Sequence, residues 1–128
     1  MDVRLFLAIA AVIAVVYGIG FILIPSVVLG LYGVESSASA VLGFRYFGAT
    51  LLSLGLANWI IRESSDWTAI RGLLIANAGG NIVGLVVSVT ATLVGTMNGM
   101  GWSAVLIYLV LLLGYLYFLS VGARQTAR

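Results

Sequence analysis

Three polar side chains stand inside long apolar stretches of this sequence. Asn77 and Asn81 are one helical turn apart, and Arg45 follows Phe44 in an earlier stretch. An unpaired amide in hydrocarbon costs several kcal/mol, so both asparagines must face a neighbouring helix, the bundle interior or a water pocket. They either hydrogen-bond across helices with Asn58, at a similar depth, or line a pocket for a headgroup or small ligand. We take Arg45, Asn77 and Asn81 as candidate ligand-binding residues.

Arg45 lies about 8 Å inside its apolar stretch, counted from Ala40 at about 1.5 Å per helical residue. A charged residue at membrane depth is a candidate for function by default. Its side chain either snorkels to the outer interface and pairs with Glu35 or a lipid phosphate, or faces the bundle and anchors an anion or polar headgroup. Both interpretations stay open at this point.

The sequence lacks the residues that most enzyme and metal sites use. It contains no cysteine and no histidine, which excludes thiol nucleophiles, the usual zinc and haem ligands and the commonest general base. No Asp or Glu lies inside an apolar stretch, although proton- or cation-coupled transport usually needs one. We expect no enzymatic activity, no catalytic residues, no metal and no cofactor. Without a basic cluster, we also expect no nucleic-acid partner.

The elements that must position these residues are apolar stretches long enough to cross a membrane. Of 128 residues, 62% are hydrophobic and only 8% are charged, which is too little charge for the surface of a soluble domain. A helix crosses the bilayer core with about 20 apolar residues, whereas barrel strands would alternate. We predict an all-α integral membrane four-helix bundle with antiparallel up-down topology, forming one transmembrane domain, 1–128. The predicted spans are 5–24, 40–61, 69–94 and 102–121.

The boundaries of these spans carry further predictions. The first stretch follows a short basic start, as a signal peptide does, but its length and the lack of a hydrophilic domain after it favour a retained span. Pro25 should end this span, because proline removes a backbone donor and clashes with the preceding turn. The segment 26–38 is too short to cross the membrane, so we expect it to lie at the interface. The sequence does not determine whether this segment is helical. Asp66 is placed to cap the third span.

Basic residues are concentrated on one side of the predicted membrane. With four spans, both termini and the loop after the second span share one side. Cytoplasmic span ends are enriched in arginine and lysine, so we predict a protein of the prokaryotic plasma membrane with both termini in the cytoplasm. The arginines on that side are Arg4, Arg62, Arg71, Arg124 and Arg128, and Arg45 alone lies on the other.

Small residues recur at every fourth position of the third span. Lipid tails are as apolar as leucine, so close packing at small residues drives helix association. We predict helix packing along this ridge, and the alternatives are space for a ligand or a homodimer seam. The ridge consists of Gly72, Ala76, Gly80, Gly84 and Ser88, and continues to Thr92. Shorter rows in the first and second spans are Ala10, Ala14 and Gly18, and Ala49, Ser53 and Ala57.

Two stretches of the sequence resemble a known group of membrane proteins. One is Pro25 with LGLYGV at 29–34, and the other is FRYFGA at 44–49, continued by LLSLGL at 51–56. They resemble an uncharacterised group of bacterial and archaeal four-span membrane proteins that is loosely similar to DoxX-like proteins. The DoxX-like resemblance implies a quinone- or redox-associated membrane subunit.

Three functions are compatible with the sequence. We predict a non-enzymatic helix-packing scaffold, which acts as a homo-oligomer or as an accessory subunit of a membrane complex. The alternative is a binder or carrier of a small amphipathic ligand, a lipid headgroup or a quinone-like molecule, in a polar intramembrane pocket. A pore would need several protomers around a polar lumen. The expected partners are the lipid bilayer, further copies of this chain and other membrane subunits.

Overall fold

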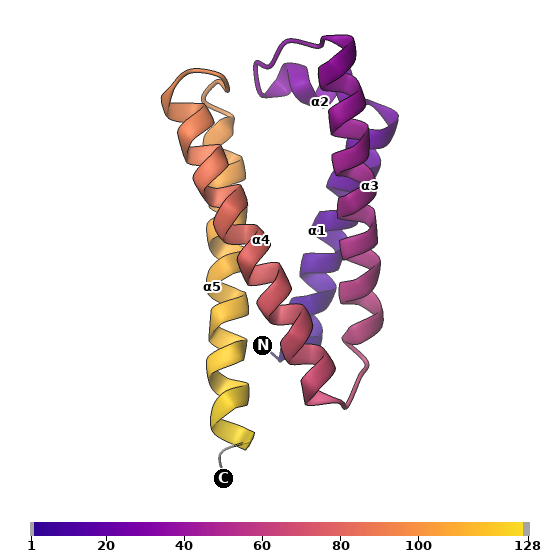
Figure 1. The fold of residues 1–128 in the computed structure, drawn as a ribbon, viewed down its shortest axis with the longest axis vertical. Helices are drawn as coiled ribbons and strands as arrows, with labels where there is room; N and C mark the ends of the chain where they lie inside the picture. Colours follow the sequence, from indigo (N-terminus) through magenta and orange to yellow (C-terminus); the bar gives the residue numbers. More distant parts are fainter. Residues whose placement is uncertain (1, 127–128) are drawn as a thin grey trace.

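The computed structural model describes residues 2–126, with side chains as far as Gly122 (Figure 1). Four of its helices are long and apolar enough to cross a membrane. The described residues contain no strand, and the fold is the all-α four-helix bundle that the sequence predicts. In chain order the helices are α1 (Val3–Leu23), α2 (Pro25–Leu31), α3 (Ala38–Ile61), α4 (Trp67–Leu93) and α5 (Gly101–Thr126).

The four long helices run up and down and form two pairs. α1 packs along α3, and α4 packs along α5, whereas contacts between the pairs are sparse. Figure 1 shows that the pairs meet near the end that carries both termini and the α3–α4 loop, and diverge toward the end that carries α2 and the α4–α5 loop. We name these the termini end and the α2 end.

Three of the long helices begin at a polar capping residue. The Asp2 carboxylate accepts from the Leu5 amide at 2.8 Å, and the Ser37 hydroxyl oxygen accepts from the Ala40 amide at 3.1 Å. Asp66 caps α4, as predicted, by accepting from the Thr68 amide at 2.8 Å. A cap satisfies backbone donors of the first turn, so each of α1, α3 and α4 starts at the residue after its cap. Each helix therefore begins two residues before the start of the span predicted from the apolar stretch.

The segment after the first span is a short helix. α1 ends at Leu23, and Pro25 occupies the first position of α2, where its missing amide costs nothing. The chain then turns at Gly33, whose φ of +71° favours glycine. In α2, Leu29 is buried while Val27 and Leu31 are exposed. The segment whose conformation the sequence left undetermined is therefore helical only as far as Leu31 and irregular from there to α3, and α2 lies across the α2 end (Figure 1).

A compact apolar core joins the two pairs near the termini end. The Phe6 ring of α1 lies edge-on to Tyr115 of α5, with ring centroids 4.9 Å apart, and 5.1 Å from Phe118. Gly114 faces Phe6 so closely that a Cβ there would overlap the ring. The buried core residues are Phe6, Leu7, Ala10, Ile70, Leu74, Ala78, Leu112, Tyr115 and Phe118.

Glycines bring α1 and α3 into backbone contact. A Cβ on Gly48 would lie 2.7 Å from the Gly18 carbonyl oxygen, and one on Gly55 would lie 2.7 Å from Val15 Cγ2. Small residues allow this approach between membrane helices. The predicted row on α1 is buried, but Ala49 and Ser53 of the predicted row on α3 are exposed. The packing face of α3 therefore passes through its glycines, because only a residue without a side chain fits against the α1 backbone.

Candidate functional site

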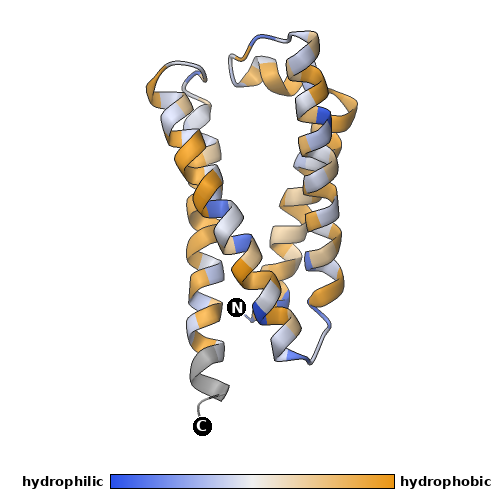
Figure 2. Ribbon diagram, in the orientation of Figure 1, coloured by the Kyte–Doolittle hydropathy of each residue, from blue (hydrophilic) through white to orange (hydrophobic). Residues whose placement is uncertain are grey.

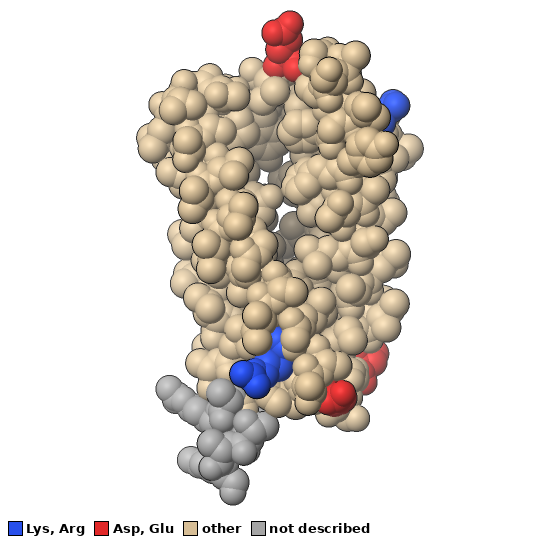
Figure 3. Space-filling model, in the orientation of Figure 1, with Lys and Arg blue, Asp and Glu red and all other residues tan. Residues whose placement is uncertain are grey.

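The divergence of the two pairs leaves a cleft of about 790 Å³, which we name the central cleft. Its walls come from all four long helices and from α2, and most of its lining side chains are apolar. None of the described side chains that line it carries a charge. Figure 3 shows the molecular surface hollowed between the pairs, with charged side chains gathered toward the two ends. A cleft of this size and polarity suits an uncharged small molecule.

Two buried asparagines join the pairs at the floor of the central cleft, toward the termini end. The Asn77 amide nitrogen donates to Asn58 Oδ1 at 3.2 Å, and the Asn58 amide nitrogen donates to Asn77 Oδ1 at 3.5 Å. Each nitrogen also donates to a carbonyl one turn earlier in its own helix, Leu54 at 3.0 Å and Leu73 at 2.9 Å. Both side chains line the central cleft and are nearly fully buried. Their amide groups are thus satisfied.

Asn81 lies one turn further along α4 and is only partly satisfied. Its amide nitrogen donates to the Asn77 carbonyl oxygen at 2.8 Å. Its Oδ1 is buried and is the one side-chain polar atom without a hydrogen-bond partner among the buried side chains described. The side chain is 7% exposed and forms part of the wall of the central cleft. Figure 2 shows hydrophilic positions in the middle of the otherwise apolar α4.

The amide orientation of Asn81 follows from its neighbour. Exchanging Oδ1 and Nδ2 would place an acceptor against the Asn77 carbonyl oxygen, which is itself an acceptor. The Asn81 nitrogen is therefore the atom that faces the Asn77 carbonyl oxygen, and Oδ1 is the atom without a described partner. A buried acceptor without a partner costs about 1–3 kcal/mol, which marks Asn81 as the position where a further group would stabilise the site.

Hydroxyl groups are placed at the opposite limit of the central cleft. The Tyr17 hydroxyl of α1 lies 3.3 Å from the Tyr32 hydroxyl, which lies 3.5 Å from Ser103 Oγ of α5. Tyr17 and Tyr32 line the cleft, as does Tyr108. The central cleft thus has amides at one limit, hydroxyls at the other and apolar walls between them.

A second set of contacts closes the α2 end, and we name it the α2 clasp, made of Leu31, Tyr32, Gly33 and Asn98. The Asn98 side chain donates to the Leu31 carbonyl at 3.0 Å, and its backbone amide donates to the Tyr32 carbonyl at 2.9 Å. A Cβ on Gly33 would lie 3.0 Å from that of Asn98. Sequence reasoning missed the α2 clasp, because nothing local indicates that two loops more than sixty residues apart will meet.

The structure does not bring Arg45 to the asparagines. Its side chain is exposed, does not line the central cleft, and makes no hydrogen bond or ion pair within the described part of the chain. The proposed pairing with Glu35 is therefore not formed. Its neighbours Phe44 and Phe47 line the cleft and contact Phe21. Arg45 belongs to the outer surface of α3, about 100° around the helix from Phe44.

The small-residue ridge of α4 is only partly covered. A Cβ on Gly84 would meet the Tyr108 ring of α5, whereas at Gly72 and Gly80 no atom of another described helix lies within 4 Å of that position. The predicted packing seam is thus not sealed along its length by this chain. Four ridge positions instead border the central cleft, and they are Ala76, Gly80, Gly84 and Ser88.

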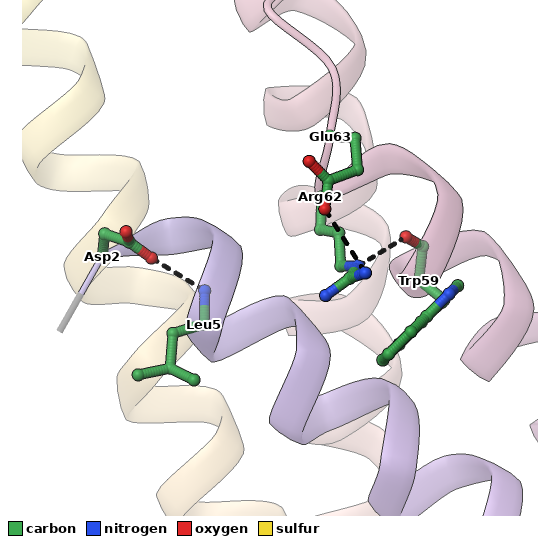
Figure 4. A network of polar contacts seen from close by, with 5 residues as sticks. All are labelled: Asp2, Leu5, Trp59, Arg62 and Glu63. Carbon is green, nitrogen blue, oxygen red and sulfur yellow. Dashed lines mark hydrogen bonds and ion pairs between the residues drawn. The ribbon is translucent and has the colours of Figure 1, made fainter.

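The charged side chains of Arg62 and Glu63 at the termini end contact the end of α3 and do not line the central cleft. Figure 4 shows Arg62 folded back on α3, where its Nε donates to the Trp59 carbonyl at 3.1 Å. Its guanidinium carbon lies 3.6 Å from the Trp59 ring centroid, and its Nη2 is 3.3 Å from Glu63 Oε1. Among the residues described, no group of three or more Asp, Glu, His or Cys could hold a metal ion.

The central cleft is therefore an uncharged and mainly apolar space among the described residues. Its polar atoms are amides and hydroxyls placed at two limits of one apolar space. No protein-family model matches this chain, and no curated protein or solved structure matches it either.

Proposed function

We propose that this membrane protein binds or carries a small, uncharged, amphipathic molecule in the central cleft. The observation that carries the proposal is the cleft itself, about 790 Å³, walled by apolar side chains and lined by buried amides at its floor. Binding sites for small molecules are typically apolar concavities of this size with few polar groups that fix orientation. An anionic headgroup is not favoured, because Arg45 lies outside the cleft.

Two glycines of α4 provide a matched test of this proposal. Gly79 and Gly80 both have open space at the Cβ position, but only Gly80 lines the central cleft. Gly80→Leu should fill the cleft, whereas Gly79→Leu should add a side chain outside it. Both changes favour helix formation to the same extent, so a difference between them reports on the cleft.

The assay uses the uncharged fluorescent probe N-phenyl-1-naphthylamine and the full chain in phosphatidylcholine nanodiscs. We expect saturable probe binding to the wild type and to Gly79→Leu, and at least about tenfold weaker binding to Gly80→Leu. Empty nanodiscs give the background. Equal binding to both variants, or no binding to the wild type above background, would contradict the proposal.

We also propose, as a second function, the homo-oligomer or accessory subunit predicted from the sequence. The observation in its favour is that Gly72 leaves open space on an exposed position of α4, where another helix can approach. Native mass spectrometry from nanodiscs tests it, with Gly72→Leu as the perturbing variant. A single monomeric species for the wild type would contradict it.

We propose a prokaryotic plasma-membrane location, with the termini end in the cytoplasm. Arg4, Arg62 and Arg71 belong to the termini end, and Arg45 to the other half of the bundle. The side chain of Arg124 and the whole of Arg128 lie outside the described residues. The excess of arginine at the termini end favours this orientation. The test introduces a single cysteine, Ser65→Cys or Ser36→Cys, and labels whole cells with an impermeant thiol reagent. We expect the cysteine at position 36 to react from outside, and labelling at position 65 alone would show the opposite orientation.

A further inference from the structure

A residue that lines the central cleft carries a buried polar atom without a hydrogen-bond partner among the described residues, and the chemistry of this atom indicates the ligand. Resting on the proposed function, we infer that the ligand is an uncharged lipid bearing a hydroxyl group, which donates a hydrogen bond to Oδ1 of Asn81. This oxygen has no partner among the described residues, and the side chain is 7% exposed on the wall of the cleft. An amide oxygen can only accept, so the group that satisfies it must donate.

The other two amides at the floor do not compete for this role. The Asn58 nitrogen donates to Leu54 and to Asn77, and the Asn77 nitrogen donates to Asn58 and to Leu73. An amide nitrogen carries two hydrogens, so both donors are used. Each of the two oxygens accepts from the opposite amide. Asn81 Oδ1 accepts from no described residue, so Asn81 is the amide at the floor that gains most from a further donor.

Reaching Oδ1 needs only a local movement. The Asn81 amide rotates about χ2, a torsion with a broad preference, and Asn81 and Gly80 both line the central cleft. Its present bond is to a carbonyl of its own helix, so a small rotation does not disturb contacts between helices. A hydroxyl at the cleft wall can thus meet the oxygen while the Asn58–Asn77 pair stays intact.

The shape of the cleft indicates where the rest of the ligand lies. From Asn81 toward the α2 end, the positions of α4 that line the cleft are Val83, Gly84, Val87, Ser88 and Ala91, and Ser88 is the one polar residue among them. Ten helical residues separate Asn81 from Ala91, a length of about 15 Å. This mostly apolar wall fits one alkyl or prenyl chain. Figure 3 shows the hollow between the pairs on the surface, which gives such a chain a lateral route from the membrane.

The hydroxyl requirement separates ligands of similar shape. An ester, an ether or a quinone offers only acceptors, so it would cover Asn81 Oδ1 without satisfying it. A lipid alcohol of equal length removes the same apolar surface and also supplies the donor. The alcohol should therefore bind more tightly than its methyl ether, and the difference should depend on Asn81.

The test compares dodecanol with dodecyl methyl ether as competitors of N-phenyl-1-naphthylamine. Phosphatidylcholine nanodiscs suit it because that lipid offers no hydrogen-bond donor. For the wild type we expect dodecanol to displace the probe at a concentration at least about tenfold lower than the ether. Asn81→Leu should bind the probe and lose this preference, because leucine keeps the shape and removes the acceptor.

The outcomes separate this inference from the proposed function. Probe binding with equal displacement by alcohol and ether in the wild type would overturn the hydroxyl inference and leave the binding function standing. A preference for alcohol that persists in Asn81→Leu would also overturn it, by placing the acceptor elsewhere. Absence of specific probe binding to the wild type would overturn both. Asn81→Gln, which keeps both the amide oxygen and the amide nitrogen, is the rescue variant and should retain the preference for alcohol.

Discussion

Replacing Asn77 with leucine should weaken the junction between the two helix pairs by about 2 kcal/mol. The change removes amide hydrogen bonds of 3.2 Å and 3.5 Å to Asn58. Hydrogen bonds between membrane helices average about 0.6 kcal/mol, and an abandoned buried acceptor adds about 1–3 kcal/mol. Asn58 is 1% exposed, so its oxygen would stay buried without a partner, while its nitrogen keeps the Leu54 carbonyl. The abandoned oxygen is the larger contribution.

A double-mutant cycle tests this reasoning. Asn58→Leu should lower the free energy of unfolding by a similar amount, because it leaves Asn77 Oδ1 without its partner instead. The variant with both leucines contains neither oxygen, so no acceptor is left unpaired, and it should be no less stable than either single variant. The free energy of unfolding is measured by SDS titration in mixed micelles, followed by far-UV circular dichroism. The reasoning is refuted if the loss in the double variant equals the sum of the two single losses, since the asparagines would then act independently.

Three further predictions concern packing, the α2 clasp and the surface. Gly48→Ala should lower the free energy of unfolding by about 1–3 kcal/mol, because the added methyl group overpacks the contact with α1. Gly43→Ala has open space at its Cβ position and should raise the free energy of unfolding by up to about 1 kcal/mol. SDS titration measures both changes, and a loss at Gly43 equal to that at Gly48 would contradict the packing argument. Asn98→Ala should speed hydrogen exchange at the Met100 amide, which donates to Asn98 Oδ1 at 2.9 Å; unchanged exchange would contradict this. Arg45→Leu should change stability by less than about 0.5 kcal/mol and leave probe binding unaltered; weaker binding would place Arg45 at the site.

The helices could be predicted because their cause is local. Stretches of apolar residues need internal backbone hydrogen bonds in lipid, and their lengths and polar ends were visible in the sequence. Asp66 could be recognised as a cap for the same reason, since a cap acts within one turn. The similar depth of Asn58 and Asn77 also followed from the antiparallel topology, and the structure joins them by hydrogen bonds.

The pairing of helices and the side on which each residue faces could not be predicted in the same way. All faces of these helices are apolar, so hydropathy does not distinguish the face toward lipid from the face toward a neighbour. Arg45 illustrates this, because Phe44 beside it lines the central cleft while Arg45 does not. The α2 clasp likewise depends on two loops meeting, and the partners of Asn98 are far away in sequence.

The central cleft follows from how the close contacts are distributed. Burial from water cannot pull membrane helices together, so contact forms where backbones approach at glycine. Gly18 and Gly48 hold α1 to α3, and Gly84 receives Tyr108 of α5, so these contacts act within pairs. Bulky aromatic residues, Phe6 among them, join the pairs near the termini end. Toward the α2 end from Asn77, Gly80 carries no side chain that could reach the opposite pair, and its Cβ position has open space around it. Lipid can occupy the space between the pairs without a hydrophobic penalty. The same small residues that suggest helix packing in the sequence therefore keep the cleft open where no helix meets them.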